Sequence, residues 1–268
     1  MPKQKEYVLG CVPYQNAKPL IQWLEMQKGQ LPIKMIYEEP SKLPLMLETH
    51  LLDAIFTSSF HALQTKNLKI LKDVSISSFN QIGSVKIFSK VPIDQIKSIA
   101  LDQSSLTSIH LAQIILKEKY HLTPVARQMS PNLSLMLKDY DAAVLIGDRC
   151  IEASSNGLHE LDLGSEWVQL TGKPFVWALW MGKENFDPYL VKFILKSKKW
   201  GIEHLKEIIE MVSTSTEWPL QFCENYYQEN IDFNFGEEHL EGLLLFQKYL
   251  LKHGFIQVNH VPKIFESI

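Results

Sequence analysis

The residues best suited to chemistry in this sequence follow short apolar runs that are typical of buried strands. Asn16 comes soon after such a run at residues 7–12, with Tyr14 two positions before it, and Ser59 follows a run at residues 53–57. Ligands of open α/β sheets bind beyond the carboxyl ends of the strands, so the Asn16 amide could lie at the floor of a cleft. The alternative is that Asn16 only caps the next helix, a position that asparagine favours.

A cluster of hydroxyl side chains follows the strand expected at residues 99–101 and opens the helix expected at residues 106–120. Backbone N–H groups at a helix N-terminus, joined by hydroxyls, can bind a carboxylate or a phosphate. One serine there could be a plain cap, but four hydroxyl residues in five positions favour an anion site. The cluster consists of Ser104, Ser105, Thr107 and Ser108.

A carboxylate follows the strand expected at residues 141–146, in the segment Gly147, Asp148 and Arg149. Asp148 could act there as an acid or a base on a bound substrate. It could equally cap a helix or pair with Arg149, and an exposed ion pair contributes little to stability. The residues alone leave these alternatives open.

Several other kinds of site are not indicated. The nine histidines and three cysteines show no paired ligand spacing, and the chain has no GxGxxG motif, phosphate-binding loop or GxSxG motif. The sequence therefore predicts no metal, nicotinamide or ATP chemistry. The 27 basic and 30 acidic residues give a formal charge of −3, which does not favour nucleic acid or an anionic membrane as a partner.

The chain is expected to be a cytoplasmic protein. Its N-terminal apolar run ends at Pro13 and is too short for the core of a signal peptide. No stretch approaches the roughly 20 apolar residues that a membrane-spanning helix needs. Three widely spaced cysteines are typical of a reducing compartment.

Short apolar runs alternate with helical patterns, which predicts an α/β fold with mostly parallel strands covered by helices. One long helix is expected at residues 187–212. Breaks near residues 89–92 and 172–174 predict two domains, one of residues 1–90 plus 174–268 and one of residues 91–173. The cleft between two such domains is where a ligand is expected.

Several segments, in this order along the chain, together resemble a known family. They are VPYQNAKPL (residues 12–20), IGSVKIFSKVP (82–92), LDQSSLTS (101–108), DAAVLIGD (141–148), LDLGSEWVQLTGKPFVWALW (161–180) and FGEEHLEGLLLF (235–246). Their ordered combination resembles the chorismate dehydratases, the first enzymes of the futalosine route to menaquinone. The resemblance implies a fold like that of type II periplasmic binding proteins, with two mixed sheets flanked by helices and a cleft between them.

The resemblance also implies a carbon–oxygen lyase that dehydrates chorismate to 3-[(1-carboxyvinyl)oxy]benzoate without a metal or an organic cofactor. Asn16 is the expected catalytic asparagine, and the base is either Asp148 or the enolpyruvyl carboxylate of the substrate. Hydrogen-bond donors on the ring carboxylate would stabilise the charge that develops as the C3 proton leaves. The expected substrate-binding residues are Tyr14, Ser59, Ser84, Ser105, Thr107, Ser108 and Gly147.

Three positions depart from the family pattern, of which Ser58 and His61 stand where proline and glutamate are common. Leu106 stands where arginine is common, and the helical pattern places it on the apolar face with Ile109, which favours a packing role. Carboxylate binding would then depend on hydroxyls and on the helix N-terminus. Two other functions stay open: a solute-binding protein of the same fold without catalysis, and the later enzyme of the pathway that forms 1,4-dihydroxy-6-naphthoate.

Overall fold

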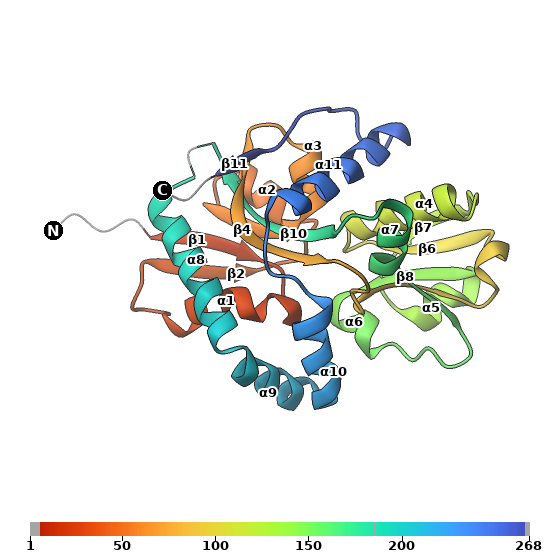
Figure 1. The fold of residues 1–268 in the computed structure, drawn as a ribbon, viewed down its shortest axis with the longest axis horizontal. Coiled ribbons are helices and arrows are strands. Elements are labelled where there is room, and N and C mark those ends of the chain that lie inside the picture. The colour runs from red at the N-terminus through yellow and green to blue at the C-terminus, as the bar shows by residue number, and fades with distance from the viewer. Residues whose placement is uncertain (1–5, 185, 266–268) are drawn as a thin grey trace.

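The computed structural model describes residues 6–184 and 186–265, which form two β-sheets with helices packed around them (Figure 1). The first sheet has six strands in the order β11-β4-β10-β3-β1-β2. β1 runs parallel to β2 and β3, whereas β10 runs antiparallel to β3 and β4. The strands are β1 (Tyr7–Cys11), β2 (Ile33–Tyr37), β3 (Ala54–Ser58), β4 (Leu68–Ser78), β10 (Phe175–Lys183) and β11 (Lys263–Phe265).

The second sheet has five strands in the order β7-β6-β8-β5-β9. β6 runs parallel to β7 and β8, whereas β5 runs antiparallel to β8 and β9. Both sheets are mixed, and the expected α/β fold with two mixed sheets is confirmed. The strands are β5 (Val85–Ser89), β6 (Ser98–Asp102), β7 (Val125–Met129), β8 (Ala142–Ile146) and β9 (His159–Asp162).

Helices flank both sheets (Figure 1). On the side of the first sheet lie α1 (Lys18–Met26), α2 (Leu43–Glu48), α3 (Ser59–Gln64), α8 (Pro188–Glu203), α9 (Leu205–Thr216), α10 (Leu220–Asn225) and α11 (Glu237–Lys252). On the side of the second sheet lie α4 (Thr107–Lys119), α5 (Leu133–Asp139), α6 (Gly147–Glu152) and α7 (Leu163–Thr171). None of the helices in the described part of the chain is both long and apolar enough to cross a bilayer.

The single helix expected at residues 187–212 is wrong, because two helices occupy this stretch. Asp187 caps α8 as expected, since its carboxylate accepts the N–H of Tyr189 at 2.9 Å. α8 ends at Glu203, and its C-cap residue His204 has a ψ of 27°. The His204 ring stacks on Trp200, with 4.2 Å between ring centroids, and its Nδ1 lies 2.8 Å from the Trp200 carbonyl oxygen. These contacts favour the turn into α9 over continued helix.

The chain crosses between the sheets twice, through residues 79–84 and through α7. The Asp162 carboxylate joins the two crossings, because it accepts backbone N–H groups from both. It also caps α7 in this way. The donors are Ile82 (3.1 Å), Gly83 (2.7 Å), Gly164 (2.9 Å) and Ser165 (3.1 Å).

β5 belongs to the second sheet, where it pairs with β8 and β9. The first domain was expected to extend to residue 90, which would have included this strand. The two-domain division stays a prediction, and the strand pairing favours residues 79–84 as the first connection between the domains.

Candidate functional site

A cavity with about 550 Å³ of empty space, counted to its open mouth, lies between the two sheets. The first sheet and its loops contribute Val12, Tyr14, Asn16, Pro40, Ser58, Ile76, Trp177 and Ala178. The first crossing and the second sheet contribute Ile82, Ser84, Val85, Ser105, Leu106, Thr107, Ser108, Ile146 and Gly147.

Asn16 and Ser84 line this cavity, and each has a buried side-chain oxygen. Within the described residues, neither Asn16 Oδ1 nor Ser84 Oγ has a hydrogen-bond partner. Asn16 lies in the short 3₁₀ helix η1 (Gln15–Ala17), and no side chain caps η1 or α1, so the capping alternative for Asn16 is wrong. A buried polar atom without a partner is costly, and a ligand that bonds to both side chains would remove this cost.

Two hydroxyls of the cluster before α4 are engaged within their own loop. Ser104 Oγ donates to Asp102 Oδ1 at 2.6 Å, and Ser104 does not line the cavity. Ser105 Oγ accepts the N–H of Ser108 at 3.1 Å, so Ser105 satisfies one donor in the first turn of α4. The Ser108 hydroxyl makes no hydrogen bond to another described residue, so it is available to a ligand.

Thr107 connects the second sheet to the first. Its Oγ1 accepts the N–H of Phe60 at 3.1 Å and is hydrogen-bonded to Ser58 Oγ. Ser59, an expected binding residue, does not line the cavity, because it begins α3 and its hydroxyl donates to the carbonyl of Val176 at 2.6 Å. Ser58, at the end of β3, lines the cavity instead.

Leu106 is half-buried, packs against the hydrophobic core and also lines the cavity, so its contacts agree with the expected packing role. It adds to an apolar wall formed by side chains such as Ile76, Val85, Ile146 and Trp177. No lysine or arginine is among the described residues that line the cavity. The described residues also contain no cluster of three or more His, Cys, Asp or Glu side chains that could hold a metal ion.

Asp148 contacts Gln15, the residue before Asn16, but does not line the cavity. Its carboxylate faces the backbone N–H of Gln15, with Oδ1 at 3.2 Å and Oδ2 at 3.4 Å. Burial raises the pKa of Asp148 to about 6, although the Gln15 N–H favours the charged form. Tyr14 and Gly147, on either side of this contact, both line the cavity.

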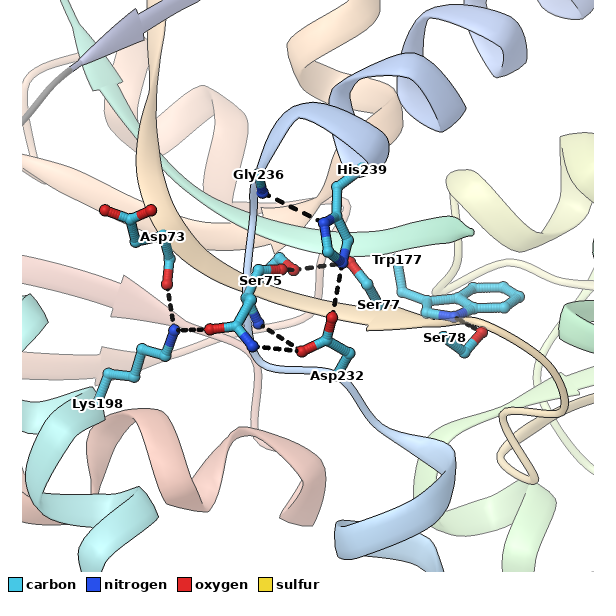
Figure 2. A network of polar contacts seen from close by, with 10 residues as sticks. Asp73, Ser75, Ser77, Ser78, Trp177, Lys198, Asp232, Gly236 and His239 are labelled. Carbon is cyan, nitrogen blue, oxygen red and sulfur yellow. Dashed lines mark hydrogen bonds and ion pairs between the residues drawn. The ribbon is translucent and has the colours of Figure 1, made fainter. Parts of the chain in front are cut away.

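Trp177 forms part of the apolar wall, and its position is fixed by a hydrogen bond. Figure 2 shows Trp177 Nε1 donating to Ser78 Oγ, at 3.0 Å. Ser78 ends β4, directly before the first crossing between the sheets. The indole therefore connects the cavity wall to the start of that crossing.

Figure 2 also shows a histidine beside serines and an aspartate, an arrangement that could suggest a hydrolase triad. His239 Nδ1 accepts the N–H of Gly236 at 3.2 Å, and Nε2 lies 2.8 Å from Asp232 Oδ2. Ser75 Oγ and Ser77 Oγ lie 2.7 Å from each other. Both ring nitrogens are engaged, so no nitrogen is left to activate a serine. The network ties residues 231–239 to β4 and is structural.

The sequence comparison decides the family. Residues 7–252 match the family described as menaquinone biosynthesis. The chain belongs to this family. The chorismate dehydratase of Thermus thermophilus is 29% identical to this chain over 226 residues, which are 77% of this chain and 81% of that protein. The expected resemblance is therefore confirmed.

Solved structures similar to this menaquinone biosynthesis family member share its fold at low sequence identity. A protein from Archaeoglobus fulgidus has a TM-score of 0.73 and 17% identity, with 93% of this chain and 98% of that chain covered. The periplasmic aliphatic sulphonate binding protein SsuA from Escherichia coli has a TM-score of 0.69 and 12% identity, with 99% of this chain and 94% of that chain covered. These similarities confirm a periplasmic-binding-protein-like fold.

Some site residues of this family member were missed by the sequence patterns. Tyr226 is buried, and its hydroxyl lies beside Ser84 and Asn16; burial raises its pKa, while these two neighbours act in the opposite direction. Trp177 and Ser58 line the cavity. Trp177 lies in the family-like segment of residues 161–180, which could have indicated it. Tyr226 lies in the C-terminal part of the chain, where the sequence pattern predicts helices and gives no sign of a site.

Proposed function

We propose that this member of the menaquinone biosynthesis family is a chorismate dehydratase that forms 3-[(1-carboxyvinyl)oxy]benzoate and water in the cavity beside Asn16. The observation that carries the proposal is the pair of buried, unpartnered oxygens on Asn16 and Ser84, two residues that line the cavity between the sheets. The named activity of the Thermus thermophilus relative supplies the substrate.

The chemistry that the cavity would support is removal of a weakly acidic proton. The C3–H bond of chorismate breaks, the C4–OH bond breaks, and the proton and hydroxide leave as water while the ring becomes aromatic. The developing charge is conjugated to the ring carboxylate. Hydrogen bonds to that carboxylate from the Nδ2–H group of Asn16 and from the Ser84 and Ser108 hydroxyls would stabilise the transition state, while Asn16 Oδ1 would accept a hydrogen bond from the C4 hydroxyl of the substrate. These donors are held in place before the substrate arrives.

Neutral donors bind both carboxylates of the substrate in this proposal. The cavity lining contains no lysine or arginine in the described part of the chain. α4 begins at Thr107, beside the cavity, and has 13 residues, so its first N–H groups and its dipole favour an anion there. The apolar wall, including Leu106, excludes water and strengthens these hydrogen bonds.

The base in this proposal is the carboxylate of the substrate's own enolpyruvyl group, which is joined to C3 through an ether oxygen. Asp148 is the alternative base. Its carboxylate accepts the N–H of Gln15 and does not line the cavity, which supports the substrate carboxylate. We also propose a cytoplasmic site of action, supported by the free, buried cysteines Cys11, Cys150 and Cys223.

Incubation of the purified protein with chorismate tests the proposal. Liquid chromatography with mass detection should show chorismate replaced by a product lighter by one water. The alternative of a binding protein, favoured by the fold that the chain shares with SsuA, predicts bound but unchanged chorismate. A parallel incubation with the cyclic futalosine derivative should leave that compound unchanged, whereas its conversion to 1,4-dihydroxy-6-naphthoate would identify the later enzyme.

A further inference from the structure

We propose that Asp148 is a positioning residue that, together with Tyr227, fixes the backbone of Gln15 and thereby orients Asn16 in the cavity. The importance of Asp148 for turnover rests on the proposed function. The structural part of the proposal is that Asp148 and Tyr227 form a clamp on the backbone of Gln15, and this part can be tested without substrate.

The first half of the clamp comes from the first turn of α6, which follows β8 directly. Asp148 accepts the N–H of Gln15, with Oδ1 at 3.2 Å and Oδ2 at 3.4 Å. In the same turn, the N–H of Gly147 donates to the carbonyl oxygen of Ser84 at 2.8 Å. The first turn of α6 therefore holds the backbone at Ser84 and directly before Asn16, the two cavity residues that each have an unpartnered side-chain oxygen.

The second half comes from the C-terminal part of the chain. The hydroxyl of Tyr227, a residue that is 1% exposed, donates to the carbonyl oxygen of Gln15 at 2.7 Å. That carbonyl belongs to the peptide bond that joins Gln15 to Asn16. Both backbone polar groups of Gln15 are thus held by side chains distant in sequence, so the η1 turn cannot rotate without losing one of them.

The geometry assigns Asp148 to this role instead of to proton abstraction. A base must reach the proton that it removes, directly or through one water. Both oxygens of Asp148 face the Gln15 N–H, and the residue is not among those that line the cavity. A carboxamide oxygen at the same place could still accept the Gln15 N–H, but it could not act as a base.

Three variants separate these roles. Asp148→Ala removes the acceptor, Asp148→Asn keeps an acceptor oxygen but cannot take a proton, and Glu152→Ala removes an exposed carboxylate from the same helix. We expect kcat with chorismate to fall about tenfold in Asp148→Ala, the size of one lost charge-assisted hydrogen bond, with a smaller change in KM. Asp148→Asn should recover most of this loss, and Glu152→Ala should match the wild type.

Equal losses in Asp148→Ala and Asp148→Asn would overturn the proposal in favour of a base, and a fully active Asp148→Ala would overturn it outright. Tyr227→Phe should also lower kcat. Its effect should not add fully to that of Asp148→Ala, because both act on one residue.

Hydrogen exchange at the Gln15 amide makes the test independent of turnover. We expect exchange to be faster in Asp148→Ala than in the wild type, and to change little in Asp148→Asn and Glu152→Ala. If the wild type leaves chorismate unchanged, the proposed function fails while this measurement still decides on the clamp. Equal exchange in all four proteins would show that Asp148 does not hold Gln15.

Discussion

The aromatic ring of Tyr14 lies directly against Gly147, so that a Cβ at position 147 would fall 2.8 Å from Tyr14 Cδ1. Gly147 has a φ of +61°, a conformation that side chains with a Cβ rarely adopt. The contact joins the η1 turn, which carries Asn16, to the turn that carries Asp148. Glycine at this position therefore allows the two sheets to meet at the cavity.

Gly147→Ala should lose stability and most of the activity, because the new methyl group must displace Tyr14. Gly157→Ala is the matched control, since Gly157 has a φ of +77° but no atom within 4 Å of an added Cβ. Both variants should lose about 1–2 kcal/mol from the left-handed backbone, measured by urea unfolding. Only Gly147→Ala should lose more than this and show reduced kcat/KM; equal behaviour of the two variants would refute the contact's importance.

Asp162→Ala should destabilise the protein by about 3 kcal/mol, because four backbone N–H groups in the two crossings lose their acceptor. Asp162→Asn keeps one acceptor oxygen and should lose less. The exposed Asp139 provides a control, and Asp139→Ala should be close to neutral. Denaturant unfolding of the three variants checks this order, and an Asp162→Ala protein as stable as Asp139→Ala would contradict it.

Asp148→Asn should make stability less dependent on pH. Burial raises the pKa of Asp148 from 3.8 to about 6, so between these values the folded protein binds a proton that the unfolded chain releases. This contributes stability that is fully present below pH 3.8 and is lost as the pH rises through about 6. At neutral pH the variant should therefore exceed the wild type by up to about 3 kcal/mol.

The comparison of Asp148→Asn with the wild type requires melting curves at several pH values. The gain of the variant should shrink as the pH falls below 6 and should be gone below 3.8, where the wild-type carboxyl is protonated in both states. A gain that is the same at every pH would show that the charge of Asp148 is not the cause.

Ser105→Ala and Ser108→Ala should affect different properties. Ser105 accepts the N–H of Ser108, so its loss should lower stability by about 1 kcal/mol, as for other lost caps. Ser108→Ala should lower kcat/KM by roughly tenfold or more, if its hydroxyl bonds to a substrate carboxylate. Melting temperatures and kinetics of both variants check this, and a loss of stability alone in both would place the carboxylate elsewhere.

The region of the site could be predicted because strand ends identify it. Asn16, Ser108 and Gly147 follow β1, β6 and β8 and all line the cavity. The direction of each side chain could not be predicted, since it depends on partners distant in sequence. Ser59 faces Val176, and Asp148 faces Gln15, and nothing in the local pattern indicates either contact.

Parts of the fold were missed for a related reason. In β4 the apolar alternation of residues 68–70 and 74–77 is interrupted at residues 71–73, where Asp73 has a φ of 66°, and the polar residues Ser75, Ser77 and Ser78 are buried. Hydrogen bonds such as those between Ser75 and Ser77, or from Trp177 to Ser78, satisfy these hydroxyls. Their partners become visible only in the folded chain.

Proton NMR of chorismate incubated with the wild type and with Asn16→Asp tests the central claim most directly. We predict that the wild type replaces the olefinic ring signals of chorismate with the aromatic signals of the substituted benzoate. Asn16→Asp should melt near the wild-type temperature but turn over at least roughly 100-fold more slowly, because a donor aimed at the developing charge is replaced by a carboxylate. Unchanged chorismate with the wild type, or equal rates in a folded Asn16→Asp protein, would contradict this account.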